Sequence, residues 1–417
     1  MQFEEKRKNG SYGPGELERV RKEANCADII GMNVHLQRAD GSTFVGRCPK
    51  CGRKTLIVRK DMYMCAGADC DMTGDAFTWL MRGRGMSLNE AADFIIEKYG
   101  IQLVPGNFPA GYTRPKQAAD ACEKATEHFQ KSLPGSAGEA YFRSRGLSPE
   151  AVKKFRLGFD RGSPIPDADQ EGLVLGGIYA DGEYGCYDRF RGRVIFPVFD
   201  EEDDMIIGMG GRILNDSKEA AKYINSPATV LFDKGRHLYG MNFARKSKRN
   251  GLILCEGYMD VIAMHSAGFD SAVAALGTAL TSYNARMLRH HTDSICLMFD
   301  SDDAGRTATM KAIRVLEKTG MNIYTASLPG AKDPDEFIRK YGRDAMEKRL
   351  GRCLNAEEFI VVSSLKNAQP GTPEASAALS HVLDSLSLSM FEKCIAVYMK
   401  MQRSPEYFVK LKKRYGL

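Results

Sequence analysis

The sequence has no uninterrupted run of about 18 apolar residues, so it contains no stretch that predicts a membrane-spanning helix. Its opening segment, MQFEEKRKNG, is polar and carries both charges, which excludes a secretory signal peptide. No internal repeat is visible. The hydrophobic fraction of 43% and the charged fraction of 27% are those of ordinary globular proteins. These features predict a cytoplasmic protein of two or three domains with no membrane partner.

The pattern of apolar residues predicts an α/β multi-domain chain. From residue 251, short apolar strands alternate with helical segments, which is typical of a doubly wound parallel sheet covered on both faces. Ser87, followed by Glu90, predicts the capped start of a helix near the end of the first domain. The predicted segments are a small β-rich domain at 16–104, a linker at 105–119, a basic α+β subdomain at 120–250, the parallel sheet at 251–335 and a helical C-terminal segment at 336–417.

The eleven cysteines are unevenly distributed. Cys48 and Cys51 form a C-x2-C pair, and Cys65 and Cys70 form a C-x4-C pair shortly after it. Four thiolates at such spacings can surround one tetrahedral Zn2+, which predicts a zinc-ribbon domain with a structural ion and no open coordination position. The alternative is a chance cluster of buried or free cysteines. The other cysteines, interpreted as packing residues, are Cys26, Cys122, Cys186, Cys255, Cys296, Cys353 and Cys394.

Acidic residues follow several of the predicted parallel strands. Glu256 comes directly after the strand at 251–255, and Asp300 and Asp302 follow the strand in ICLMFDSDDAGR at 295–306. Asp260 lies one helical turn after Glu256. Ligands lie at the carboxyl ends of parallel strands, and carboxylate oxygens select Mg2+ or Mn2+. The alternative, an acid that only caps the next helix, suits Asp302 alone but does not explain acids at several strand ends.

A basic segment precedes this acidic cluster. Between residues 211 and 250, nine lysines and arginines stand against three acids, an excess equal to the net charge of +6 for the whole chain. Such a segment suits a polyanion held beside metal ions. The alternative is an ordinary solvated surface.

In this order, the motifs resemble those of bacterial DnaG-type DNA primases. The likeness runs from about residue 16 to 350 and continues more weakly to about 410. CEGYMDV and FDSDDAG are together the pattern of the TOPRIM fold, which topoisomerases and some nucleases share. KYINSP and FDKGRHLYG are more specific to primases. The other matching stretches are RFRGRVIFPVFD, GGRIL, ALGTALT and KDPDEF.

The resemblance implies roles for individual residues. It implies Glu256, Asp300 and Asp302 as catalytic metal ligands, with Asp260 a further ligand of Mg2+ or Mn2+. Asp333 and Asp335, in KDPDEF, are expected as two further ligands of the same Mg2+ or Mn2+ site. The residues expected to hold template and nucleotide are Arg191, Arg193, Arg212, Lys222, Lys234 and Arg236.

Two features of the zinc site depart from the family pattern. The family usually has His where this chain has Cys51, and its second ligand pair is usually C-x2-C. Both changes keep four ligands, so zinc is still expected, but the template preference is open.

The resemblance therefore predicts a DNA primase, a DNA-directed RNA polymerase that makes short RNA primers on single-stranded DNA from NTPs by metal-dependent nucleotidyl transfer during DNA replication. Glu256 could also help to deprotonate the attacking hydroxyl. The expected location is the cytoplasm, at the nucleoid or replication fork. A replicative helicase is a candidate partner, but no helicase-binding domain is visible before Leu417. This suggests either a stand-alone phage or mobile-element primase or a shortened form of a longer chain.

Two other functions remain open from the sequence. Another TOPRIM enzyme, a nuclease or a topoisomerase, would share the acidic motifs, although no domain with a catalytic tyrosine is visible. A non-enzymatic zinc module that binds DNA would leave the pair of Glu256 and Asp300 unexplained.

Overall fold

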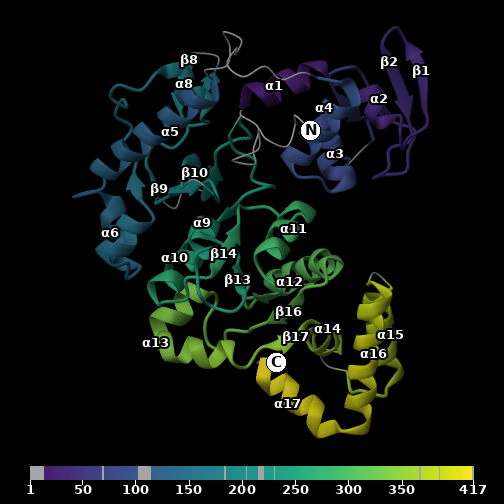
Figure 1. Ribbon diagram of the computed structural model, residues 1–417. Coiled ribbons are helices and arrows are strands. Elements are labelled where there is room, and N and C mark those ends of the chain that lie inside the picture. Colours follow the sequence, from purple (N-terminus) through teal and green to yellow (C-terminus); the bar gives the residue numbers. More distant parts are fainter. Residues whose placement is uncertain are drawn as a thin grey trace. The chain divides into compact units, whose positions relative to one another are not determined.

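The computed structural model describes residues 14–67, 70–101, 114–182, 185–202, 204–214, 220–229, 231–365, 368–384 and 386–415 (Figure 1). The chain divides into two compact units, residues 1–113 and 114–417. Within the described residues, no helix has both the length and the apolar character needed to cross a membrane.

The first unit is a small antiparallel sheet with four short helices. Its strands run in sequence order, β1-β2-β3-β4-β5, so each pairs with the next along the chain. The strands are β1 (Leu36–Asp40), β2 (Thr43–Gly46), β3 (Leu56–Val58), β4 (Tyr63–Cys65) and β5 (Thr73–Gly74). The helices are α1 (Pro14–Glu23), α2 (Cys26–Ile30), α3 (Ala76–Arg84) and α4 (Leu88–Tyr99). The predicted capping box of Ser87 and Glu90 is confirmed at the start of α4.

The second unit begins with α5 (Arg114–Lys131), so the last residues of the predicted linker 105–119 are helical, and residues 105–113 lie outside the described residues. The short elements that follow are α6 (Ala137–Ser144), α7 (Pro149–Lys154), β6 (Gly158–Phe159), α8 (Gln170–Leu175), β7 (Tyr179–Gly182) and β8 (Gly185–Asp188). Then β9 (Arg193–Phe199) and β10 (Ile206–Ile213) pair antiparallel. With β11 (Tyr223–Asn225) they form a sheet of order β11-β10-β9-β6.

A six-stranded sheet of order β12-β14-β13-β15-β16-β17 follows. Its four central strands are parallel, which confirms the predicted doubly wound sheet. They are β13 (Leu252–Cys255), β14 (Ala272–Ala275), β15 (Ser294–Leu297) and β16 (Asn322–Thr325). The edge strands β12 (Leu238–Tyr239) and β17 (Leu354–Asn355) pair antiparallel and lie outside the predicted boundaries 251–335.

Helices cover both faces of this sheet. Successive side chains of a strand point to opposite faces, and here the side chains on both faces are apolar and need to be covered. Leu252 and Leu254 belong to one hydrophobic core, whereas Ile253 and Cys255 belong to another. The helices between the strands are α9 (Met241–Ala244), α10 (Tyr258–Ser266), α11 (Ser282–His291) and α12 (Asp303–Leu316), with the 3-10 turn η2 (Glu317–Thr319).

The C-terminal part of the second unit is helical, as predicted, apart from β17. Its helices are α13 (Pro334–Leu350), α14 (Ala356–Leu365), α15 (Pro373–Leu383), α16 (Leu388–Arg403) and α17 (Pro405–Tyr415). The predicted boundary between residues 335 and 336 falls inside the first turn of α13, where Pro334 occupies a favourable early helical position.

Candidate zinc centre and acidic edge of the parallel sheet

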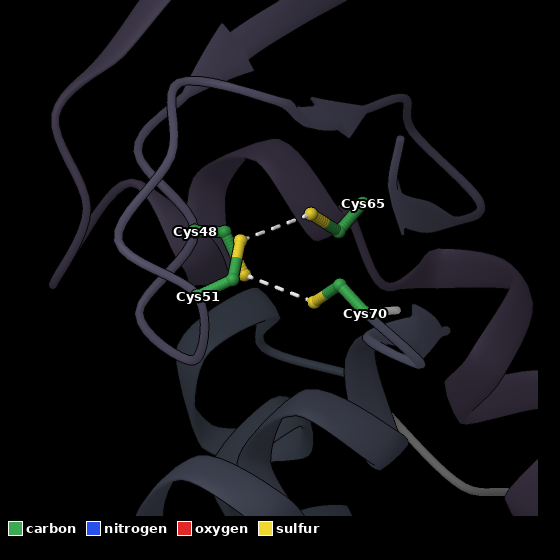
Figure 2. Close-up of side chains that lie close together, drawn as sticks. All are labelled: Cys48, Cys51, Cys65 and Cys70. Atoms are coloured by element: carbon green, nitrogen blue, oxygen red, sulfur yellow. Dashed lines mark hydrogen bonds between the residues drawn. The ribbon is translucent and has the colours of Figure 1, made fainter. Parts of the chain in front are cut away.

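The four cysteines of the two predicted pairs converge in the first unit. Cys48 and Cys51 lie in the loop between β2 and β3, Cys65 ends β4, and Cys70 lies just before β5. Their sulfur atoms all lie within 4.8 Å of one another (Figure 2). The sulfurs of Cys48 and Cys70 are 3.7 Å apart, as are those of Cys51 and Cys65. Zinc–sulfur bonds of about 2.3 Å in a tetrahedron place sulfurs about 3.8 Å apart, so the geometry fits Zn2+.

Nearby donors prepare these thiols for a metal ion. The backbone N–H of Gly67 lies 3.4 Å from the Cys65 sulfur, and the hydroxyl of Thr55 lies 3.1 Å from the same atom. A backbone N–H of Arg53 lowers the pKa of the Cys51 thiol. Zinc binds thiolates rather than thiols, and hydrogen bonds to the sulfur fix its orientation.

In the second unit, two of the predicted acids meet at the carboxyl edge of the parallel sheet. Glu256 follows β13 directly, and Asp300 follows β15 after a short extension. The backbone N–H of Asp300 donates a hydrogen bond of 2.8 Å to the Oε1 atom of Glu256. The backbone N–H of Ser301 donates to the carbonyl of Lys332, at 2.9 Å. Three segments far apart in sequence are thus tied together at one edge.

The acids at this edge perturb one another. Loss of hydration around its carboxylate, together with the charges of Asp300 and Asp302, raises the pKa of Glu256. Partial burial likewise raises the pKa of Asp300, and the charges of Asp333 and Asp302 add to the effect. Carboxylates that raise one another's pKa share a site of strongly negative potential. Their oxygens fit the ligand preference of Mg2+ or Mn2+.

Asp302 and Asp333 also cap helices. Asp302 accepts a hydrogen bond of 2.8 Å from the backbone N–H of Gly305 at the start of α12. Asp333 accepts one of 2.7 Å from the backbone N–H of Glu336 at the start of α13. The capping role considered for Asp302 is therefore present. Capping uses one oxygen of each carboxylate, so it is compatible with a metal-binding role, which stays a prediction for both residues.

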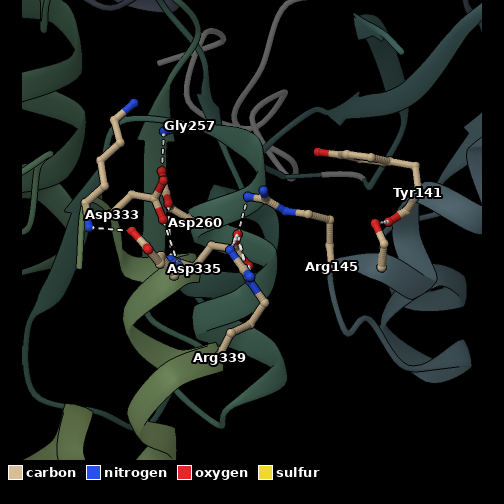
Figure 3. A network of polar contacts seen from close by, with 10 residues as sticks. Tyr141, Arg145, Gly257, Asp260, Asp333, Asp335 and Arg339 are labelled. Carbon is tan, nitrogen blue, oxygen red and sulfur yellow. Dashed lines mark hydrogen bonds and ion pairs between the residues drawn. The ribbon is translucent and has the colours of Figure 1, made fainter. Parts of the chain in front are cut away.

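Asp260 and Asp335 lie deeper, in a polar network (Figure 3). Asp260 is buried and accepts hydrogen bonds from the backbone N–H groups of Gly257, at 3.1 Å, and Asp335, at 3.4 Å. The carboxylate of Asp335 is 1% exposed and forms ion pairs with Arg145 and, at 3.3 Å, with Arg339. Burial, with nearby carboxylates, raises the pKa of Asp260 well above its usual value. These contacts hold α10 and α13 together and tie Arg145, just after α6, to them.

Five of the six predicted acids divide into two groups. Glu256, Asp300 and Asp302 lie at the edge, while Asp260 and Asp335 are engaged in the buried network. The sixth, Asp333, caps α13. Among the described residues, only the four cysteines form a set of three or more His, Cys, Asp or Glu side chains with all ligand atoms within 4.8 Å. The carboxylates are less tightly gathered, so the full set of six metal ligands stays a prediction.

The predicted basic residues also differ in their surroundings. Arg193 is 7% exposed, and its Nη1 atom donates to the carbonyl of Ala221 at 3.0 Å, so it braces the chain between β10 and β11. Arg212 stacks over the ring of Tyr141, with 4.4 Å between the guanidinium carbon and the ring centroid. Arg236 is placed likewise over Tyr283, at 4.7 Å. The exposed members are Arg191, Lys222 and Lys234.

Two cavities lie at different edges of the parallel sheet. One, of about 190 Å³, is lined by Asp300, Ser301 and Arg306 and so adjoins the acidic edge. The other, of about 500 Å³, is lined by Gly251 and Ser294, at the amino ends of β13 and β15. Since ligands of parallel sheets bind at the carboxyl ends of strands, the smaller cavity is the one that belongs to the candidate site.

Comparison with known proteins agrees with this arrangement. Three family models match the chain: CHC2 zinc finger at residues 14–107, DNA primase catalytic core, N-terminal domain, at 126–245, and Toprim-like at 253–338. A DNA primase of Clostridium acetobutylicum is 33% identical over 369 residues, covering 84% of this chain and 61% of that protein.

Two solved structures have a similar fold. The zinc-binding and RNA polymerase domains of the Aquifex aeolicus primase are 26% identical, with a TM-score of 0.61, covering 95% of this chain and 100% of that one. A DnaG primase catalytic domain bound to single-stranded DNA is 30% identical, with a TM-score of 0.58, covering 69% of this chain and 99% of that one.

The fold and its two sites define a zinc-ribbon protein with a TOPRIM-type sheet, the class in which Zn2+ is structural and Mg2+ or Mn2+ is the catalytic metal. Within that class, the chain belongs to the family of bacterial DnaG-type DNA primases. It spans about 61% of the length of the Clostridium acetobutylicum relative.

Proposed function

We propose that this chain is a DNA primase that makes short RNA primers on single-stranded DNA from NTPs. The observation that carries the proposal is the joining of Glu256 to the backbone of Asp300 at the carboxyl edge of a TOPRIM-type sheet. The similarity to a DnaG catalytic domain that binds single-stranded DNA supports the choice of template.

The residues at the acidic edge would divide the work of nucleotidyl transfer. A divalent cation, when bound, would neutralise the negative charge that develops on the phosphates. Glu256 and Asp300 would hold the cation, with Asp302 contributing from the start of α12. Glu256 would also help to take a proton from the attacking 3′-hydroxyl. The polar network around Asp335 would hold α10 and α13 together next to the acidic edge of the sheet.

The basic residues would hold the polyanions. Lys222 and Lys234 are exposed and could contact phosphates of template or nucleotide. The guanidinium of Arg212 lies over the Tyr141 ring, so the N–H groups at the edge of the guanidinium could still donate to a phosphate. Arg193 is buried against the carbonyl of Ala221, so we propose that it shapes the strand pair rather than touching nucleic acid.

We extend the proposal to the domain boundaries and to the cellular location. Residues 16–104 would form the zinc-binding domain, residues 120–250 and 251–335 the catalytic core, and residues 336–417 the helical segment. The enzyme would act in the cytoplasm at the replication fork, with a replicative helicase as a candidate partner.

The test is primer synthesis by wild-type protein and by Asp300→Asn, with single-stranded DNA, NTPs and Mg2+ or Mn2+. The variant keeps the size of the side chain and removes one ligand charge, so synthesis should fall on the order of a hundredfold or more. DNA binding should persist, and stability should not fall, because the repulsion from neighbouring carboxylates is relieved.

Asp303→Asn is the matched control. Asp303 lies in the same turn but pairs with Arg306, at 2.5 Å, and is not among the predicted ligands. It should retain primer synthesis within a few-fold of wild type. Full activity of Asp300→Asn under limiting Mg2+ would show that the acidic edge is not the catalytic centre. Nicking of DNA without primer formation would indicate a nuclease, and binding alone a non-enzymatic module.

A further inference from the structure

Lys332 brings a cation to the acidic edge. Its Nζ atom lies 3.4 Å from the Oδ2 atom of Asp300. Lys332 immediately precedes the N-cap of α13, and its backbone is held on both sides: its carbonyl accepts from Ser301, at 2.9 Å, and its N–H donates to Glu336, at 2.7 Å. The main chain of Lys332 is thus anchored, whereas its side chain is 64% exposed and has room to move.

The ammonium of Lys332 acts on the same carboxylates that are proposed to bind metal. Its positive charge lies 3.4 Å from Asp300 and so offsets part of the negative charge at this edge. Lys332 therefore supplies part of the positive charge that a divalent cation would supply, and it does so at an oxygen of Asp300.

We propose that Lys332 is a tethered competitor of the divalent metal: it pairs with Asp300 when the edge holds no metal and must leave Asp300 when a metal ion binds. This rests on the proposed function, because it takes Glu256 and Asp300 as metal ligands. The competition weakens the binding of free metal. It thereby favours metal that arrives with a nucleotide, because triphosphate oxygens add ligands that protein carboxylates lack.

The size of the effect follows from Coulomb's law. A unit charge and a divalent charge about 5 Å apart repel in water by enough to change an affinity roughly tenfold. Because the side chain of Lys332 is 64% exposed, it can move away from the metal, and added salt weakens the repulsion as well. Removing the charge of Lys332 should therefore tighten metal binding by about threefold to tenfold at low ionic strength.

The experiment measures Mn2+ binding to the zinc-loaded full chain, without nucleotide or DNA, by the loss of the electron paramagnetic resonance signal of free Mn2+. The variants are Lys332→Met and Lys332→Gln, which remove the charge with different polarity. The control is Lys340→Met in α13, since Lys340 pairs with Glu336, at 2.6 Å, instead of with a predicted ligand. Far-UV circular dichroism checks that each variant is folded.

We expect both Lys332 variants to bind Mn2+ more tightly than wild type by about threefold to tenfold, with the gain shrinking as salt is added and the control within about twofold. Unchanged or weaker binding by folded Lys332 variants, with normal binding by wild type, would overturn this inference and leave the proposed function standing. Wild-type protein that binds no Mn2+ would instead overturn the metal site of the proposed function. Only in the supporting case should primer synthesis by Lys332→Met reach half its maximum at lower Mg2+.

Discussion

Replacing Cys65 with Ala should unfold the first unit while the second unit stays folded. Cys65 ends β4, and its sulfur lies 3.7 Å from that of Cys51. The substitution removes one of four zinc ligands and deprives Thr55 and Gly67 of the sulfur that they contact. Because the unit is small and its strands have two to five residues, its hydrophobic core is limited.

The magnitude can be set against the stability of a small domain. A structural zinc ion contributes on the order of 10 kcal/mol to folding at neutral pH. A domain is typically stable by only about 5–15 kcal/mol in total. Loss of most of the zinc contribution would therefore consume most or all of the free energy of unfolding of the first unit.

The chain carries its own reporter for this experiment. Its one tryptophan, Trp79, lies in α3 of the first unit, with its ring edge-to-face to Tyr63 at 5.1 Å. Tryptophan fluorescence therefore reports on the first unit, whereas far-UV circular dichroism reports mainly on the helices of the second. Cys65→Ala should show the fluorescence of unfolded protein before denaturant is added, with most of the helical signal retained.

Cys26→Ala is the matched control. Cys26 is buried in the same unit, 1% exposed, but is not part of the cluster. Its loss should cost about 1–2 kcal/mol as a packing defect, with zinc retained. Elemental analysis that finds no zinc in carefully purified wild-type protein, or a Cys65→Ala variant with native tryptophan fluorescence, would refute the reasoning.

Three further predictions concern the second unit. Arg145→Met should destabilise the second unit by about 2–3 kcal/mol, because Asp335 is left buried with one fewer partner; urea unfolding followed by circular dichroism measures this. Adding Asp335→Asn should restore part of the lost stability. Strictly additive effects of the two substitutions on the free energy of unfolding would show that the two residues are not coupled. Lys234→Ala should weaken the binding of template or nucleotide, measured by fluorescence anisotropy, and leave the melting temperature unchanged. The control variant, Lys318→Ala, should bind as wild type does. Equal binding by wild type and both variants would mean that Lys234 is only a solvated residue. Burial lowers the pKa of His265 to about 4 in the folded protein, from about 6.5 in the unfolded chain, so stability is full above pH 6.5 and falls as the pH drops toward 4. The fall, up to about 3 kcal/mol, should be smaller in His265→Gln. An identical dependence of melting temperature on pH in wild type and variant would contradict this prediction.

Features that depend on local spacing could be predicted from the sequence. The zinc ligands form two short pairs, and each pair needs only one turn to bring its sulfurs together. Glu256 and Asp300 could be found because each follows an apolar strand, and parallel strands end at a common edge. The capping box at Ser87 is equally local.

Features that depend on distant contacts could not be predicted. The pair of Arg145 and Asp335 joins residues 190 positions apart, and an isolated arginine in a polar segment carries no signal of its partner. Lys332 stands in a recognised motif, but only the fold shows that its ammonium faces Asp300. The resemblance implies a nucleic-acid-binding role for Arg193, but a motif match does not reveal that this side chain is 7% exposed and donates to a backbone carbonyl.

The two groups of acids explain why a like-charged cluster is tolerated in this fold. The inner acids have fixed partners: Asp335 forms ion pairs with two arginines, and Asp260 accepts hydrogen bonds from two backbone N–H groups. Of the outer acids, Asp300 pairs with Lys332, whose long side chain is mostly exposed. A permanent counter-charge thus holds the helices in place, while an exchangeable one leaves the edge open to a stronger cation. The proposed metal chemistry needs both, because a rigid frame positions the ligands and a weakly held counter-ion lets the metal enter and leave.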